Sequence, residues 1–142
     1  MAKAVLALAG IALVSILAFA AVRLLHPAIG PSLRNVSAER LSQSGIVMLN
    51  PFPWDESEMS RAQAEQIALK QGPGGSVVQT VLAEVVLTNP SPAKPRLCWV
   101  VSLPGSQIVS SGPPGSARRT ASWYLVLIDA HSGEFIQGSA GG

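Results

Sequence analysis

The longest uninterrupted hydrophobic segment of this chain lies at its N-terminus, where residues 4–22 contain no charged side chain. At 1.5 Å rise per residue, a helix of this length spans about 28 Å, close to the ~30 Å hydrocarbon core of a bilayer. A helix of a small soluble domain is typically apolar on one face only. The pattern therefore predicts that residues 1–25 form a membrane-inserting helix.

Two interpretations of this segment compete. Ala18-Phe-Ala20 is a small-x-small sequence of the kind at which signal peptides are cleaved, but the apolar run continues beyond it. We favour an uncleaved, single-pass signal-anchor over a protein secreted after cleavage near Ala20. Three arginines between positions 23 and 40 weakly favour a cytoplasmic C-terminal side, whereas the basic start and apolar core favour export. We prefer an extracytoplasmic C-terminal domain at the cell membrane.

Prolines and other helix breakers dominate residues 26–56, which predicts a Pro-rich linker. A short helix fits Ser37 to Gln43, with Ser37 as its N-cap. We expect Phe52 and Trp54 to pack against the folded domain. Asn35-Val-Ser also matches the N-glycosylation pattern, which has meaning only in a eukaryotic secretory host.

Residues 57–138 show the pattern of one small α+β domain. Ser60 and Gln63 form a capping box at the start of a helix, and Gly72 ends it. Alternating apolar residues then predict antiparallel strands at 77–88, 96–103, 122–129 and 134–137. With one helix available, we expect it to pack on one face of a 3–4-stranded sheet. We expect residues 139–142 to be a flexible tail.

The second predicted strand separates its side chains into two sets. We assign Leu97, Trp99, Val101 and Leu103 to the core, which places Cys98 on the opposite face. Cys98 is then a strand residue rather than a nucleophile, because no histidine is near it in the sequence.

A tight turn joins the last two strands. Gly133 can adopt a positive φ there, and the Asp129 carboxylate can accept hydrogen bonds from the turn backbone. Asp129 and Glu134 flank the turn and also suggest a catalytic carboxylate pair. We prefer the turn roles, in which Asp129 caps the turn and Glu134 begins a solvated strand.

Residues 59–137 resemble the PepSY domain family in two places. The Ala-rich segment from Ser60 to Leu69 is similar to the opening helix of the family. The strand and turn of 123–135 look like its strand–Asp–Ala–x–Thr–Gly–Glu hairpin, here with Asp129, Ala130, Ser132, Gly133 and Glu134. Ser132 stands where threonine is usual, and the loop from Pro104 to Ala121 departs from the compact pattern.

The resemblance implies a cystatin-like fold, with a helix laid on an antiparallel sheet. It also implies an extracytoplasmic domain that inhibits a peptidase or takes part in protein interactions. It transfers no catalytic residue to this chain.

Composition and charge exclude several classes of function. Lys3 and Arg23 flank the apolar segment and account for the net charge of +2, so the folded part is near neutral and lacks the basic surface of a nucleic-acid-binding protein. A lone cysteine permits no internal disulfide or cysteine-based zinc cluster. His26 and His131 are far apart, and no cofactor motif is present. We therefore predict no enzyme, no cofactor and no metal site.

The most specific functional hypothesis is a non-catalytic, membrane-anchored PepSY-like interaction module that modulates or inhibits a peptidase or another envelope protein. Its partners would be the lipid bilayer, through residues 4–22, and a protein or peptide. The alternative is an accessory single-pass subunit of a larger membrane complex. Small residues within the anchor, such as Ala9 and Gly10, would then pack against neighbouring helices.

Overall fold

The computed structural model describes residues 30–91, 93–108 and 119–142. They form an α+β fold with a five-stranded antiparallel sheet in the order β1-β2-β3-β6-β7, and β4 and β5 form a separate two-stranded hairpin. The elements, in chain order, are α2 (Ala38–Gln43), β1 (Ile46–Leu49), α3 (Arg61–Gln71), β2 (Gln79–Leu87), β3 (Arg96–Pro104), β4 (Gln107–Ile108), β5 (Arg119–Thr120), β6 (Trp123–Asp129) and β7 (Phe135–Gly141).

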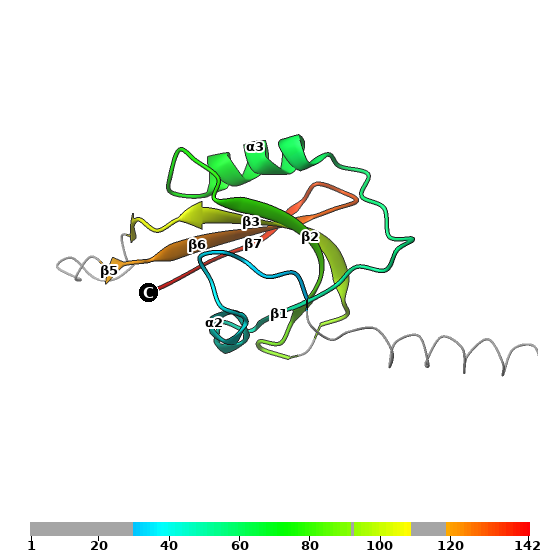
Figure 1. The fold of residues 1–142 in the computed structure, drawn as a ribbon, viewed down its shortest axis with the longest axis horizontal. Helices are drawn as coiled ribbons and strands as arrows, with labels where there is room; N and C mark the ends of the chain where they lie inside the picture. Colours follow the sequence, from blue (N-terminus) through cyan, green and yellow to red (C-terminus); the bar gives the residue numbers. More distant parts are fainter. Residues whose placement is uncertain (1–29, 92, 109–118) are drawn as a thin grey trace, which may run out of the picture.

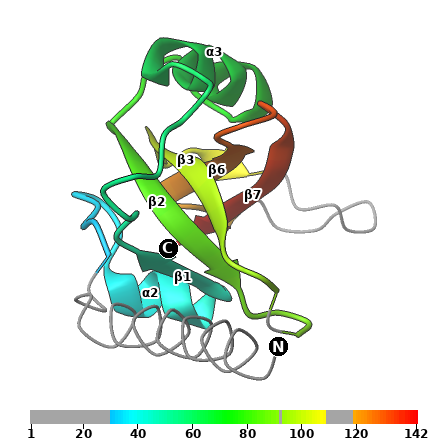
Figure 2. The same cartoon turned by 90° about the vertical axis from the view of Figure 1, so that its right-hand side faces the viewer.

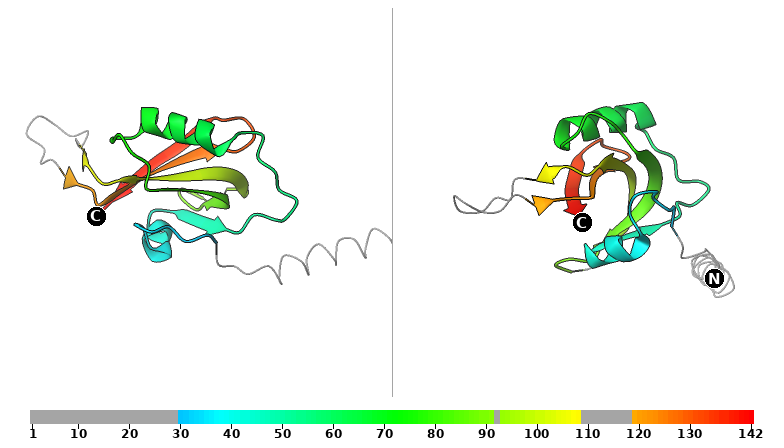
Figure 3. Two further views of the ribbon diagram at one scale, coloured as in Figure 1. Left: turned by 45° about the horizontal axis from the view of Figure 1, so that its top comes forward. Right: turned by 60° about the vertical axis from the view of Figure 1, so that its left-hand side comes forward.

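The sheet curls (Figures 1 and 2). A cluster of buried hydrophobic side chains lies on each of its faces. We call the face covered by α3 the outer face and the face covered by α2 the inner face. All five strands contribute side chains to the inner cluster, so the sheet wraps around it (Figure 3). The predicted α+β class and antiparallel sheet are confirmed, the short helix expected after Ser37 is present as α2, and the sheet has a fifth strand, β1.

Helix α3 lies on the outer face through its two alanines. Ala64 and Ala68 are fully buried against β3 and β6, and their small side chains let the helix approach the sheet closely. The predicted capping box is confirmed, because Ser60 Oγ accepts from Gln63 N and the Gln63 side chain accepts from Ser60 N. At mid-helix, the Glu65 carboxylate accepts a hydrogen bond of 2.7 Å from Thr80 Oγ1, which ties α3 to β2.

Residues 30–49 were expected to belong to a linker, but they fold onto the inner face. Strand β1 pairs with β2, and α2 packs beside it with Ser37 as the predicted N-cap. The interpretation of residues 26–56 as a linker is therefore wrong for residues 30–49. The physical reason is that the segment supplies four buried apolar side chains, those of Leu33, Val36, Leu41 and Ile46.

The predicted single core face of β3 is also incomplete. Val101 and Leu103 lie in the outer cluster as expected, but Cys98 and Val100 are equally buried in the inner cluster. Strand β3 is the central strand of the sheet, and a hydrophobic cluster covers each of its two faces. Alternation therefore cannot distinguish a core side from a solvent side in this strand.

Two further predictions, on the C-terminal tail and on the aromatic residues before α3, have mixed outcomes. The expected flexible tail is wrong for Ser139–Gly141, because these residues extend β7 and pair with β6. Phe52 is buried as predicted, whereas Trp54 is 62% exposed and stacks on the Phe52 ring at a centroid distance of 4.9 Å.

The predicted membrane segment, residues 4–22, lies outside the described residues. Within the described ranges, no helix is long and apolar enough to cross a membrane.

The side chain of Asn35 fastens the N-terminal segment to β3. Its Nδ2 donates to Leu103 O at 3.3 Å, and its Oδ1 accepts from the fully buried hydroxyl of Ser102. This amide belongs to the glycosylation pattern noted above, but in the folded protein it is committed to these two bonds.

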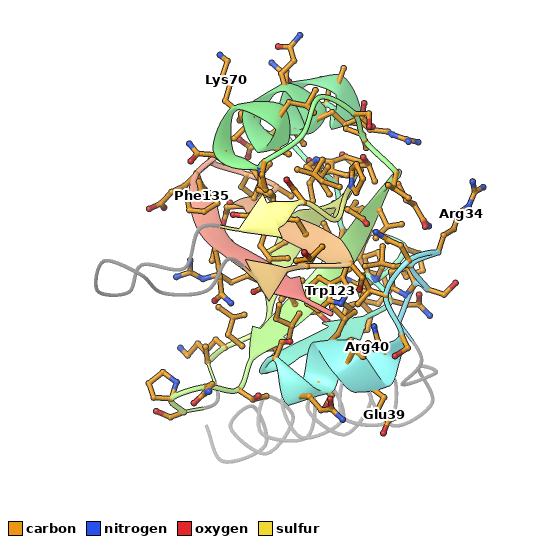
Figure 4. The ribbon with its side chains drawn as sticks, turned by 90° about the vertical axis from the view of Figure 1, so that its left-hand side faces the viewer. Arg34, Glu39, Arg40, Lys70, Trp123 and Phe135 are labelled. Carbon is orange, nitrogen blue, oxygen red and sulfur yellow. The ribbon has the colours of Figure 1, made fainter. Side chains whose placement is uncertain are left out.

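Replacing Asn35 with alanine is expected to destabilise the fold by about 1–3 kcal/mol, because the Ser102 hydroxyl would lose its buried acceptor. Urea unfolding of the full-length protein measures the change. Arg34→Ala is the matched control, since the Arg34 side chain is exposed and projects away from the sheet (Figure 4). Equal destabilisation by both variants would contradict the role assigned to Asn35.

Candidate functional site

The hairpin that resembles the PepSY pattern is a hydrogen-bonded turn. Asp129 Oδ1 accepts from the backbone N–H of His131 at 3.0 Å and of Ser132 at 2.9 Å. Gly133 has φ of 76° and donates its N–H to Asp129 O. Ser132 Oγ accepts from Glu134 N at 3.2 Å. The geometry gives these residues the turn roles expected from the sequence, with one Asp129 oxygen committed to the backbone.

Ala130 connects this turn to the start of α3. The residue is fully buried, and its carbonyl accepts from Met59 N at 3.2 Å and from Ser57 Oγ at 2.9 Å. The Trp99 indole N–H donates to Ser57 Oγ at 2.8 Å from the neighbouring strand. The hairpin therefore positions α3 over the outer face.

The stability of the fold is expected to fall in acid through Asp129. The hydrogen bond from Ser132 N is the main cause that holds the pKa of Asp129 below its usual value of about 3.9. A carboxylate whose pKa is lowered by folding stabilises the protein fully above its unfolded pKa, and this contribution is lost as pH falls through the folded pKa.

Asp129→Asn should remove this acid-dependent part and cost about 1–2 kcal/mol at pH 7, because a neutral acceptor forms weaker hydrogen bonds than a carboxylate. Thermal unfolding between pH 2 and 7 measures both effects. Glu134→Gln is the control, because the Glu134 carboxylate is exposed at the other end of the turn. An unchanged acid profile in Asp129→Asn would refute this assignment.

A pocket of about 400 Å³ opens on the inner face. Its lining comes from β2, β3, β6 and β7 and from the turn between β2 and β3, namely Val85, Leu87, Ala93, Lys94, Arg96, Cys98, Leu127 and Ile136. Val85, Cys98 and Leu127 are buried, whereas Lys94 and Arg96 are exposed. Among the described residues, the lining is thus apolar with two cations at the solvent side, and none of its side chains is a carboxylate.

The Cys98 thiol in this pocket has low reactivity at neutral pH. Burial raises the pKa of its thiol to about 12, so the thiol stays protonated at neutral pH. The thiolate is the reactive form of cysteine. The geometry is thus that of an apolar lining residue, in line with the sequence-based preference.

Strand β7 forms an uncharged edge beside this pocket. Among the described residues it pairs with β6 only, and it contains neither a charged residue nor a proline. The Tyr124 and Trp123 rings occupy the space that side chains at Gly138 and Gly141 would fill. At the opposite edge, the backbone of Gly30 lies close to the Met48 carbonyl of β1. Among the described residues, β7 is thus the longer of the two edge strands of the sheet.

Metal-binding side chains do not gather in the described part of the chain. No group of three or more His, Cys, Asp or Glu side chains lies close enough together there to hold a metal ion. His131 Nδ1 lies 3.9 Å from Glu58 Oε1 at the surface, with both side chains more than half exposed. The other histidine, His26, lies outside the described residues.

Sequence reasoning missed the pocket, although one signal for it was present. Lys94 and Arg96 flank Pro95 directly before a strongly apolar strand, an arrangement that places two cations at a strand entrance. Comparisons of the chain with models of protein families, with curated proteins and with solved structures found no match. The candidate site therefore rests on its own geometry, which consists of the pocket and the adjacent β7 edge.

Proposed function

We propose that this chain is a non-catalytic interaction module that binds an extended peptide segment of another protein along the free edge of β7. In this proposal residues 4–22 anchor the module in the cell membrane, and the folded part lies on the extracytoplasmic side. The observation that carries the proposal is the edge itself, which is seven residues long and uncharged.

An unprotected edge of this kind favours strand addition. Soluble proteins usually block their edges with lysine, proline, bulges or covering loops, because unpaired N–H and C=O groups attract other strands. In β7 the register shift lies near its start, at the pairing with Leu127 and Ile128, and the remaining residues pair regularly with β6. In peptide recognition by strand addition, main-chain hydrogen bonds supply affinity and alternate side chains supply specificity.

The resemblance to the PepSY family points to a peptidase or another envelope protein as the source of this peptide. The position of α3 over an antiparallel sheet supports that hypothesis, because it is the arrangement that the resemblance implies. Segments α2 and β1 lie outside the residues that carry the resemblance. A peptide paired with β7 would be held in the extended conformation. Peptidases bind their substrates in the same conformation.

Site-specific crosslinking in native membranes tests the pairing. A photoreactive residue is placed at Gln137 or at Ser139 of the full-length protein, and the adducts are sequenced by mass spectrometry. Side chains on one face of a strand recur every second residue. The two positions should therefore reach residues of one partner segment that are two apart. Adducts scattered over unrelated segments would contradict strand addition.

Proline substitutions supply the matched control. Successive residues of an edge strand direct their N–H groups alternately toward the neighbouring strand and away from it. Of Ser139→Pro and Ala140→Pro, one should lower the unfolding temperature, and the other should abolish the crosslinks while the fold persists. If the folded variant keeps its crosslinks, the proposal fails.

The alternative of an accessory membrane subunit predicts the opposite dependence on the two parts of the chain. If the transmembrane helix is the contact, a partner should co-purify after the folded part is deleted. If β7 is the contact, co-purification should survive replacement of residues 4–22 by an unrelated membrane anchor. The two deletions therefore separate the hypotheses in one experiment.

A further inference from the structure

We propose that the inner-face pocket between β2, β3, β6 and β7 binds a single acyl chain that ends in an anionic head group. This site is distinct from the peptide edge, because it uses side chains of the inner face rather than the backbone of β7. The inference does not depend on the peptide proposal, and either can fail alone.

The lining matches the chain of such a ligand. Six of the eight lining residues are apolar, and the floor is formed by Val85, Cys98 and Leu127, each at most 3% exposed. Leu87 and Ile136 stand partly exposed at the sides, so apolar surface continues from the floor toward solvent. A volume of about 400 Å³ falls in the range of small-molecule sites, about 300–1,000 Å³.

The charges match the head group. Lys94 and Arg96 are the charged lining residues, and both are cations at exposed positions. Asp129 pairs with Cys98 across the strands, and its Oδ1 accepts hydrogen bonds from the turn backbone. An anion at the mouth would therefore meet two cations, whereas a cationic head group would be repelled.

The geometry also separates this ligand from the other occupants of an apolar pocket. A wholly apolar ligand would leave the two cations without a function in binding. The peptide side chains that end in an anion, those of Asp and Glu, have short stems and would leave much of the apolar lining uncovered. A carboxylate and a phosphate monoester share the required chemistry, and the experiment distinguishes them.

Photoaffinity labelling of the full-length protein in nanodiscs of zwitterionic lipid tests the proposal. Four probes carry the same photoreactive twelve-carbon chain and end in a carboxylate, a phosphate, an alcohol or a trimethylammonium group. Labelled residues are mapped by mass spectrometry. We expect label on the segments that contain Leu127 and Ile136. At least one anionic probe should label about tenfold more than the alcohol, and the ammonium probe least.

Two variants locate the head group. Lys94→Gln combined with Arg96→Gln should reduce anionic labelling to the level of the alcohol without changing the unfolding temperature. Lys70→Gln is the matched control, because Lys70 projects from α3 on the other side of the sheet (Figure 4).

Three results would overturn the proposal. Equal labelling by the four probes would show that Lys94 and Arg96 take no part in binding. Label confined to residues 4–22 would show partition into the bilayer only. If no probe labels the pocket, the acyl-chain proposal is wrong, and a side chain of a protein partner becomes the better candidate for its occupant. Stronger labelling by phosphate than by carboxylate, or the reverse, would support the proposal and identify the head group.

Discussion

A chain that begins at Ser57 is expected to lose cooperative unfolding, whereas a chain that begins at Gly30 should keep it. The segment between these positions supplies Leu33, Val36, Leu41 and Ile46, each at most 8% exposed, to the inner cluster. Full burial of one such side chain stabilises a protein by about 1.5–3 kcal/mol. The four together contribute about 6–12 kcal/mol, comparable to the whole stability of a small domain, about 5–15 kcal/mol.

Thermal unfolding followed by circular dichroism compares the two fragments, and amide NMR spectra report whether each has a single fold. The fragment from Gly30 is the control for removal of the predicted anchor. Loss of β1 would also expose the edge of β2, so the shorter fragment should aggregate more readily. A sharp transition at the same temperature in both fragments would show that residues 30–56 are dispensable.

Replacing Trp123 with alanine is expected to cost about 3–5 kcal/mol, the usual range for removal of a buried large aromatic residue. Trp123 is 2% exposed, and its side chain lies on the inner face between β6 and α2 (Figure 4). Its ring covers the backbone of Gly141 in β7, so the substitution should loosen the end of this strand as well.

Trp123→Phe should cost clearly less than Trp123→Ala. The buried Trp123 Nε1 has no hydrogen-bond partner among the described residues, so its replacement breaks no described bond. Urea unfolding measures both changes. Trp54→Ala is the control, because Trp54 is 62% exposed and a surface substitution usually stays within about 0.5 kcal/mol. Similar losses for Trp54→Ala and Trp123→Ala would refute the assignment of Trp123 to the core.

Local signals predicted the elements that depend on neighbouring residues. The capping box of Ser60 and Gln63 begins α3, and Gly133 takes the positive φ that the last turn requires. Strands β2, β3 and β6 lie close to their predicted ranges, because alternation along a strand is itself a local property. The turn roles of Asp129 and Ser132 belong to this group, since their partners are within five residues in the chain.

The binding features depend on distant residues and could not be predicted in this way. The pocket joins Val85 of β2 to Ile136 of β7, and only the curl of the sheet brings them together. Residues 139–142 were expected to form a flexible tail. Ser139–Gly141 nevertheless continue the edge strand, and the rings of Tyr124 and Trp123 cover Gly138 and Gly141. Such aromatic cover compensates for the missing side chains.

The sequence by itself determined the fold class, the start of α3, the final turn and the hypothesis of a membrane anchor at residues 4–22. Only the tertiary structure decided that β1 joins the sheet with α2 packed beside it, that both faces of β3 are buried and that β7 is an edge strand that reaches Gly141. The physical reason is the range of the forces involved. Caps and turns depend on hydrogen bonds between near neighbours, whereas burial depends on which distant surfaces the curled sheet brings into contact.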